Sequence, residues 1–152
     1  MTAAKTPGMD KLLVSLKGLG KGKGQVGWFD SAKYENGTPV AYVATIQEYG
    51  WGPIPPRSFI RPTVTAQKTK WSKVGGQYAK MSLEGKAAPN DALKAVVEAA
   101  RGDIAQAISS VTEPALSDAT LAARARRNNS STKPLVDSGL MLATLTTQVK
   151  EK

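Results

Sequence analysis

The sequence predicts an α+β fold: a small antiparallel sheet formed with the terminal strand, packed by several amphipathic helices, with a Pro-rich crossover arm. Three observations support this class. Apolar residues recur at three- and four-residue steps in several segments, which is typical of amphipathic helices. Two short stretches have strand character, one near residue 26 and one at the C-terminus. At 152 residues the chain is long enough for one core, so we expect residues 1–152 to form a single domain.

The N-terminal segment predicts a helix followed by a basic glycine-rich stretch. Five apolar residues at helical spacing indicate the helix: Met9, Leu12, Leu13, Leu16 and Leu19. Gly18 and Gly20 end it. Residues 17–25 form a basic Gly/Lys segment that we expect to be flexible. Residues 22–27 match the letters G-x-G-x-x-G, but they precede a strand and open no helix, which favours a loop over a dinucleotide site.

A strand, a turn and a helix are expected next. The strand runs from about Val26 to Phe29, with Trp28 on a face of the sheet, and the turn lies in the sequence YENGTP. A helix is then expected, with Thr38 as its N-cap and Pro39 at its first position. Along it, three- and four-residue steps place these side chains on one face: Val40, Val43, Ala44 and Gln47.

Two longer helices follow the Pro-rich segment. The first begins near Pro62, and its stripe consists of Val64, Trp71, Val74, Tyr78 and Met81. Trp71 is therefore expected in the core, and Gly75-Gly76 should weaken or kink this helix. The second begins at Asn90 or Asp91, either of which can cap it. Its apolar face consists of Leu93, Val96, Val97, Ala100, Ile104, Ile108 and Val111.

The C-terminal part predicts a helix over residues 116–127, a basic polar loop over residues 126–134 and a final strand. Asp137 is placed to cap a short helical turn, after which Leu145, Thr147 and Val149 alternate as in a strand. Because two strands alone make a marginal sheet, we expect a third strand, from this chain or from a neighbouring subunit.

The amino-acid composition excludes most kinds of catalytic site. The chain has no cysteine and no histidine, which excludes disulfides, thiolate metal sites and the commonest general base. The spacing of Asp30, Glu35 and Glu48 singles out no carboxylate pair. We therefore expect a protein that is not an enzyme and uses no cofactor or metal. Neither a membrane span nor the apolar run of a signal peptide is evident, so we expect a soluble, unexported protein.

The net charge of +9 suits contact with nucleic acid or an acidic protein surface. Candidate contacts lie in two basic segments: Lys17, Lys21, Lys23, Arg124, Arg126 and Arg127. Trp28, Trp51 and Trp71 are the aromatic residues that could stack on bases beside them. The alternative is that both basic segments are solvated and flexible. No helix-turn-helix, zinc-finger or RNP motif accompanies them.

The segment GPIPPRSFIRPT, residues 52–63, is stiff, apolar and cationic at once. Its prolines fix φ and remove backbone donors, so it can neither extend a sheet nor continue the preceding helix. Phe59 is costly to leave in water, and Arg57 and Arg61 suit carboxylates or backbone carbonyls. Two interpretations stay open. The segment is a crossover packed on its own domain, or it is an arm that docks on a neighbouring subunit with Phe59 as anchor and the arginines as polar rim.

Two blocks far apart in the sequence carry recognisable signatures. The first joins Glu-aromatic-Gly to a PPR-x-F-x-R-P crossover: Glu48, Tyr49, Gly50, Pro55, Pro56, Arg57, Phe59, Arg61 and Pro62. The second reads Pro-Leu-x-Asp-(Thr/Ser)-Gly-x-(Leu/Met) before the final strand: Pro134, Leu135, Asp137, Ser138, Gly139, and Leu140 or Met141. In this order the blocks resemble the neck or tail-completion proteins of tailed bacteriophages, the virion morphogenesis family.

The resemblance implies a structural virion protein of the neck or upper tail, assembled in the host cytoplasm. It would form a hexameric or dodecameric ring with itself, contact the portal or head-completion connector and the tail terminator or tail tube, and let double-stranded DNA pass. The interface residues that follow are Glu48, Tyr49, Pro55, Pro56, Arg57, Phe59, Arg61, Asp137 and Gly139. The competing hypothesis is a basic nucleic-acid-binding accessory protein, whose affinity for free duplex would fall steeply with salt.

Overall fold

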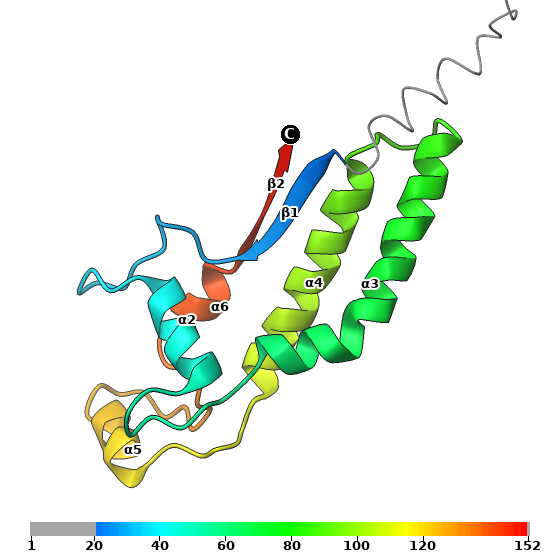
Figure 1. Ribbon diagram of the computed structural model, residues 1–152. Helices are drawn as coiled ribbons and strands as arrows, with labels where there is room; N and C mark the ends of the chain where they lie inside the picture. Colours follow the sequence, from blue (N-terminus) through cyan, green and yellow to red (C-terminus); the bar gives the residue numbers. More distant parts are fainter. Residues whose placement is uncertain (1–20, 152) are drawn as a thin grey trace, which may run out of the picture. The chain divides into compact units, whose positions relative to one another are not determined.

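The computed structural model describes residues 21–151, in which helices predominate over one small sheet (Figure 1). Along the chain the elements are β1 (Gly22–Gly27), α2 (Val40–Tyr49), α3 (Ile60–Leu83), α4 (Asp91–Ser110), α5 (Asp118–Ala125), α6 (Leu140–Ala143) and β2 (Thr146–Glu151). β1 and β2 pair as an antiparallel two-stranded sheet. The α+β class and the pairing of the terminal strand are thus confirmed. None of the described helices is both long and apolar enough to span a bilayer.

The described residues divide into two compact units. The first unit contains residues 21–26, 68–100 and 147–151, and the second contains residues 27–67 and 101–146. α3 and α4 each contribute residues to both units. The single domain expected from the chain length stays a prediction. The helix expected from Met9 to Leu19 lies outside the described residues.

In the first unit, glycine lets β1 lie directly against α4. A Cβ atom on Gly24 would lie 2.5 Å from Cγ1 of the buried Val97, closer than any real side chain tolerates. The strand accordingly begins at Gly22, four residues before the expected start at Val26. The expectation of a flexible loop is therefore wrong for residues 22–25. The cause is tertiary, because a backbone without side chains fits closely against a helix.

The helical part of the first unit also depends on a glycine. α3 continues through Gly75-Gly76, where a weakening or kink was expected. A Cβ atom on Gly75 would lie 3.0 Å from Cγ2 of Val96 on α4, so glycine permits a close approach of the two helices. Figure 1 shows them side by side, joined by residues 84–90. At the end of α3, the buried Ser82 donates a hydrogen bond from Oγ to the carbonyl oxygen of Ala88 (2.8 Å).

The apolar stripe of α3 is less covered than expected. Trp71 is half-buried, so its placement in the core was wrong, and Tyr78 and Met81 are exposed. Ser82 is the one buried residue along α3. The helix also starts at Ile60, two residues before the expected Pro62, because its first turn is capped from outside the helix, as described below.

The second unit has its core around α2, the crossover and the segment leading into α6. Its buried apolar residues are Val40, Ala44, Phe59, Ile104, Ile108, Leu135, Met141 and Leu145. Trp28 joins this core from just after β1, so its expected place on a sheet face is wrong. Its ring meets that of Phe59 edge-on at 6.1 Å between centroids, and its Nε1 donates to the carbonyl oxygen of Met141 (2.7 Å).

The local signals for helices are largely confirmed. α4 and α5 form where their periodicity predicted, and Ser117 caps α5 by accepting a hydrogen bond from the N–H of Thr120. α2 begins one residue late, with Pro39 as its N-cap instead of Thr38. The cap predicted for Asp137 is wrong, because Gly139, in a left-handed conformation, is the N-cap of α6. Among residues 21–151, no third strand joins the sheet.

Candidate functional site

The carboxylate of Glu48 caps the N-terminus of α3. Glu48 lies in the last turn of α2 and is 2% exposed. Its Oε2 accepts hydrogen bonds from the backbone N–H groups of Phe59 (2.8 Å) and Ile60 (2.9 Å), and its Oε1 accepts one from that of Arg61 (3.0 Å). These are the donors that the start of a helix leaves unpaired. The glutamate of the Glu-aromatic-Gly signature therefore anchors the crossover.

The guanidinium of Arg61 completes this clamp. Its Nε lies 3.0 Å from Oε1 of Glu48, and its Nη2 donates to the Glu48 carbonyl oxygen (2.9 Å). Burial alone would raise the pKa of Glu48, but the N–H groups of Ile60, Arg61 and Phe59 and the Arg61 side chain outweigh it, so the pKa lies below its ordinary value. Glu48 is thus ionised at neutral pH, and its role is to hold the crossover.

Exposed aromatic residues lie close in sequence to the clamp residue Glu48. Tyr49 is 62% exposed and Trp51 is 69% exposed, and the Arg61 guanidinium lies 4.5 Å from the centre of the Tyr49 ring. Tyr42, also exposed, is seven residues before Tyr49 on α2 and therefore shares its face. Tyr42, Tyr49 and Trp51 are called the aromatic surface below.

Arg57 turns inward from the crossover and is only 6% exposed. Its Nε donates to the carbonyl oxygen of Pro114 (2.6 Å), its Nη2 to that of Ala115 (3.0 Å) and its Nη1 to Oε1 of Gln47 (3.4 Å). No acidic side chain of residues 21–151 forms an ion pair with it. Burial, together with the positive charge of Arg124, lowers the pKa of Arg57.

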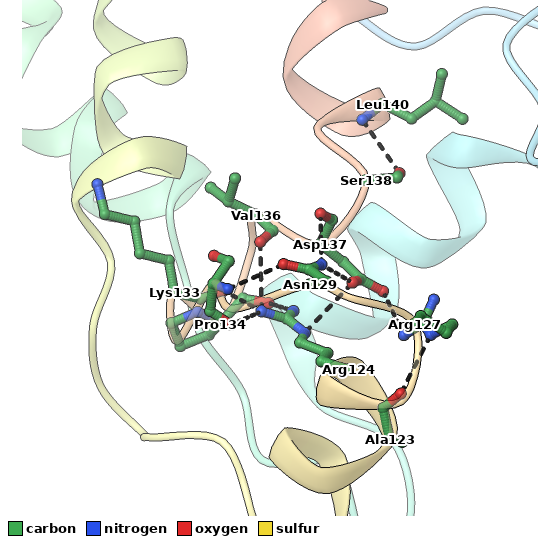
Figure 2. Close-up of polar contacts among 11 residues, drawn as sticks. Ala123, Arg124, Arg127, Asn129, Lys133, Pro134, Val136, Asp137, Ser138 and Leu140 are labelled. Atoms are coloured by element: carbon green, nitrogen blue, oxygen red, sulfur yellow. Dashed lines mark hydrogen bonds and ion pairs between the residues drawn. The ribbon is translucent and has the colours of Figure 1, made fainter.

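Arg124, in the last turn of α5, organises the segment of the second signature (Figure 2). It is 4% exposed, and its Nη atoms donate to four carbonyl oxygens, at 2.9 to 3.3 Å, from Ser131, Lys133, Pro134 and Val136. Its Nε lies 3.4 Å from Oδ1 of Asp137, an ion pair without hydrogen-bond geometry. Within the part of the chain that the structure describes, Nε is therefore a buried donor without a hydrogen-bond acceptor.

Asp137 links the second signature to the end of α5. Its Oδ1 accepts a hydrogen bond from Nδ2 of Asn129 (2.7 Å), and its Oδ2 pairs with Nη2 of Arg127 (3.2 Å), as Figure 2 shows. This arrangement explains why Asp137 does not cap α6. The pKa of Tyr34 is raised, mainly by burial and to a lesser extent by the negative charge of Asp137.

A pocket of about 740 Å³ in the second unit brings both arginines together. Its walls come from residues 34–38, one face of α2, the first part of the crossover, residues 115–120 and residues 134–141. Arg57, Arg124 and Asp137 are the charged residues that line it, so positive charge exceeds negative charge by one. Such a site is suited to bind an anionic group.

The predicted interface residues separate into inner and outer groups. Glu48, Arg57 and Phe59 are buried and bound within their own unit, so the docking interpretation that used Phe59 as its anchor is wrong. Of the two alternatives for the crossover, packing on its own domain is the one observed for Phe59. The remaining members are exposed or half-buried: Tyr49, Pro55, Pro56, Arg61, Asp137 and Gly139.

The predicted nucleic-acid contacts also differ in accessibility. Arg124 is wrong as a surface contact, because backbone carbonyls surround its guanidinium in a buried site. Lys21, Lys23, Arg126 and Arg127 are exposed. Lys17 lies outside the described residues.

Gln47 and Tyr34 are among the pocket residues that sequence reasoning did not assign to any site. In the sequence, Gln47 was marked only as a position on the face of a predicted helix, and Tyr34 only as the first residue of the predicted turn YENGTP. The one available signal was the position of Gln47 directly before the Glu-aromatic-Gly signature.

Comparison of the chain with protein-family models, with curated proteins and with solved structures finds no match.

Proposed function

We propose that this chain is a structural subunit of a bacteriophage neck or upper tail, which oligomerises into a ring that joins the head connector to the tail and lets DNA pass. The resemblance of its two sequence blocks motivates the proposal. Its proposed partners are copies of itself and the portal-proximal and tail proteins on either side.

The observation that carries the proposal is the way the two blocks fold together. They are separated by more than 70 residues, yet Pro53, Ile54, Pro55 and Arg57 line the same pocket as residues 134–141. Blocks that line one pocket contribute to the same structural feature, so they are expected to occur together in one protein. The joint presence of the two signatures is therefore more specific than either signature alone.

The aromatic surface is the proposed contact between neighbouring subunits. Tyrosine, tryptophan and arginine are enriched at protein interfaces, and here Tyr42, Tyr49 and Trp51 are exposed, with Arg61 stacked on Tyr49. A patch of this kind that meets a different surface on the next copy forms a closed ring when the rotation between copies closes. The clamp at Glu48 fixes Arg61, which contacts the Tyr49 ring.

The test measures the assembly state of the full-length chain by native mass spectrometry and negative-stain electron microscopy over a range of concentrations. We expect closed rings from the wild type and at least tenfold weaker association for the double variant Tyr49→Ser, Trp51→Ser, with unchanged circular dichroism. Tyr78→Ser is the matched control, since Tyr78 is an exposed tyrosine of α3. Phage particles made without the chain should contain separate heads and tails. If the wild type stays monomeric and particles join without it, the proposal is wrong.

Binding to free duplex DNA distinguishes the neck subunit from the competing hypothesis, a nucleic-acid-binding accessory protein. An accessory protein that binds nucleic acid would show an affinity that falls with salt at a log-log slope of about 0.9 per phosphate neutralised. A ring subunit that only surrounds DNA should bind free duplex negligibly near physiological salt. Tight duplex binding by a monomer, lost in an Arg126→Gln, Arg127→Gln variant, would favour the accessory protein over the neck subunit.

A further inference from the structure

We propose that the pocket of the second unit binds the carboxylate of an acidic, partly apolar peptide segment presented by a partner protein, with Arg57 as the residue that receives it. This inference concerns the ligand of the pocket and does not require the neck assignment. It rests on the charge state, hydrogen bonding and lining of the pocket.

Within residues 21–151, Arg57 is a buried cation without a counter-ion. Charged side chains are almost never buried this fully unless they are paired, because removing a charge from water costs several kcal/mol. Two backbone carbonyls and the amide of Gln47 satisfy three of the five N–H bonds of its guanidinium, and the contact to Gln47 is long at 3.4 Å. Two N–H bonds, one on each Nη atom, thus have no acceptor among residues 21–151, and Arg57 lines the pocket.

The other charges of the pocket do not neutralise Arg57. Asp137 is the one carboxylate among the lining residues, and its oxygens are already engaged by Asn129, Arg127 and Arg124. Arg124 adds a second positive charge, and its buried Nε lacks a hydrogen-bond acceptor among residues 21–151. An incoming carboxylate would therefore pair with the charge of Arg57 and reduce the repulsion between the guanidinium groups of Arg57 and Arg124.

The rest of the lining favours a peptide over a small free anion. At about 740 Å³ the pocket is far larger than one carboxylate requires, and it lies within the range that holds drug-sized ligands. Apolar walls come from Val43, Ile54, Leu116 and Leu140, while the hydroxyl group of Thr38 can meet the backbone of a bound segment. The net charge of +9 would steer an acidic segment toward the protein.

The experiment titrates the full-length chain with synthetic peptides and follows backbone amide and arginine Nε–H signals by NMR. The probe is acetyl-Leu-Glu-Leu-amide, and the matched ligand is acetyl-Leu-Gln-Leu-amide. We expect the glutamate peptide to shift the Arg57 Nε–H signal and the amides of residues 115–120 and 134–141. The glutamine peptide should bind about tenfold more weakly or worse, since hydrogen bonds to a charged group contribute about 1.5–3 kcal/mol.

A variant of Gln47 tests the site without removing Arg57, whose loss could unfold the unit. Gln47→Glu places a carboxylate 3.4 Å from the Arg57 guanidinium within the chain, so it should abolish binding of the glutamate peptide. Thr45→Glu adds the same charge to an exposed position of α2 outside the pocket and should leave binding unchanged.

Three results would overturn the proposal. Equal affinity for the two peptides would show that charge is not recognised, and absence of any shift at several millimolar peptide would show that the pocket does not bind such a segment. Inorganic phosphate acting at lower concentration than the glutamate peptide would identify a small-anion site instead. None of these results bears on ring assembly, so the failure of one proposal is distinguishable from the failure of the other.

Discussion

Replacing Glu48 by glutamine should destabilise the second unit strongly, although the change removes only one charge. The carboxylate accepts four hydrogen bonds, from three backbone N–H groups and from the Nε of Arg61. In either orientation of the glutamine amide, its NH₂ group faces two donors, so two of the four bonds are lost. A hydrogen bond to a charged group contributes about 1.5–3 kcal/mol, which gives an expected loss of about 3–6 kcal/mol.

The dependence of stability on pH provides a second readout of the same contact. The pKa of Glu48 in the folded protein lies below its ordinary value. Its contribution to stability is therefore fully present above the ordinary glutamate pKa of about 4.3 and is lost as the pH falls through the lower pKa of the folded state. The stability difference between wild type and Glu48→Gln should consequently shrink between neutral pH and pH of about 3.

Urea unfolding followed by circular dichroism at several pH values measures both effects. The exposed Glu35 supplies the matched control, because Glu35→Gln removes the same charge from the surface and should change stability by less than about 0.5 kcal/mol. A loss below about 1 kcal/mol for Glu48→Gln with an unchanged m-value, or a difference that does not vary with pH, would refute the reasoning.

Two further predictions concern single positions. Gln47→Glu should stabilise the unit by about 1–2 kcal/mol through a charge-assisted contact with Arg57, measured as a higher urea midpoint, and a lower midpoint would show that Arg57 needs no counter-ion. Gly76→Ala should raise stability by about 0.5–1 kcal/mol, because no atom lies within 4 Å of the added methyl group and alanine favours a helix interior. Gly75→Ala should lose that gain, since its methyl group would lie 3.0 Å from Val96; equal thermal midpoints for the two alanine variants would contradict the close approach of α3 and α4.

Helices and turns were predictable where the signal lies within a few residues. α4 and α5 follow from apolar periodicity, and the cap at Ser117 follows from a side chain that reaches the N–H of Thr120. The turn before α2 follows from Asn36 and Gly37, the latter with a φ of 82°. In each case the interactions that decide the conformation are made by near neighbours in the chain.

The candidate site was only partly predictable. The sequence marked Arg57, Phe59 and Asp137 as unusual, but the family resemblance placed all three at an interface, while the residues alone left open whether the crossover packs on its own domain. The structure instead pairs Arg57 with carbonyl groups of Pro114 and Ala115, more than 50 residues away. No local pattern announces such contacts, because a backbone carbonyl carries no sequence signature.

By itself, the sequence determined the α+β class, the positions of the main helices and the stop imposed by the prolines of the crossover, since periodicity and fixed φ angles act locally. Only the tertiary structure decided that Gly22 and Gly24 belong to a strand, that Phe59 points inward and that Arg57 and Arg124 are buried in one pocket. The physical reason is that burial and pairing of charge depend on which distant segments meet. Burying a polar or charged group without a partner costs free energy, so only a few side chains are tolerated where distant segments pack together.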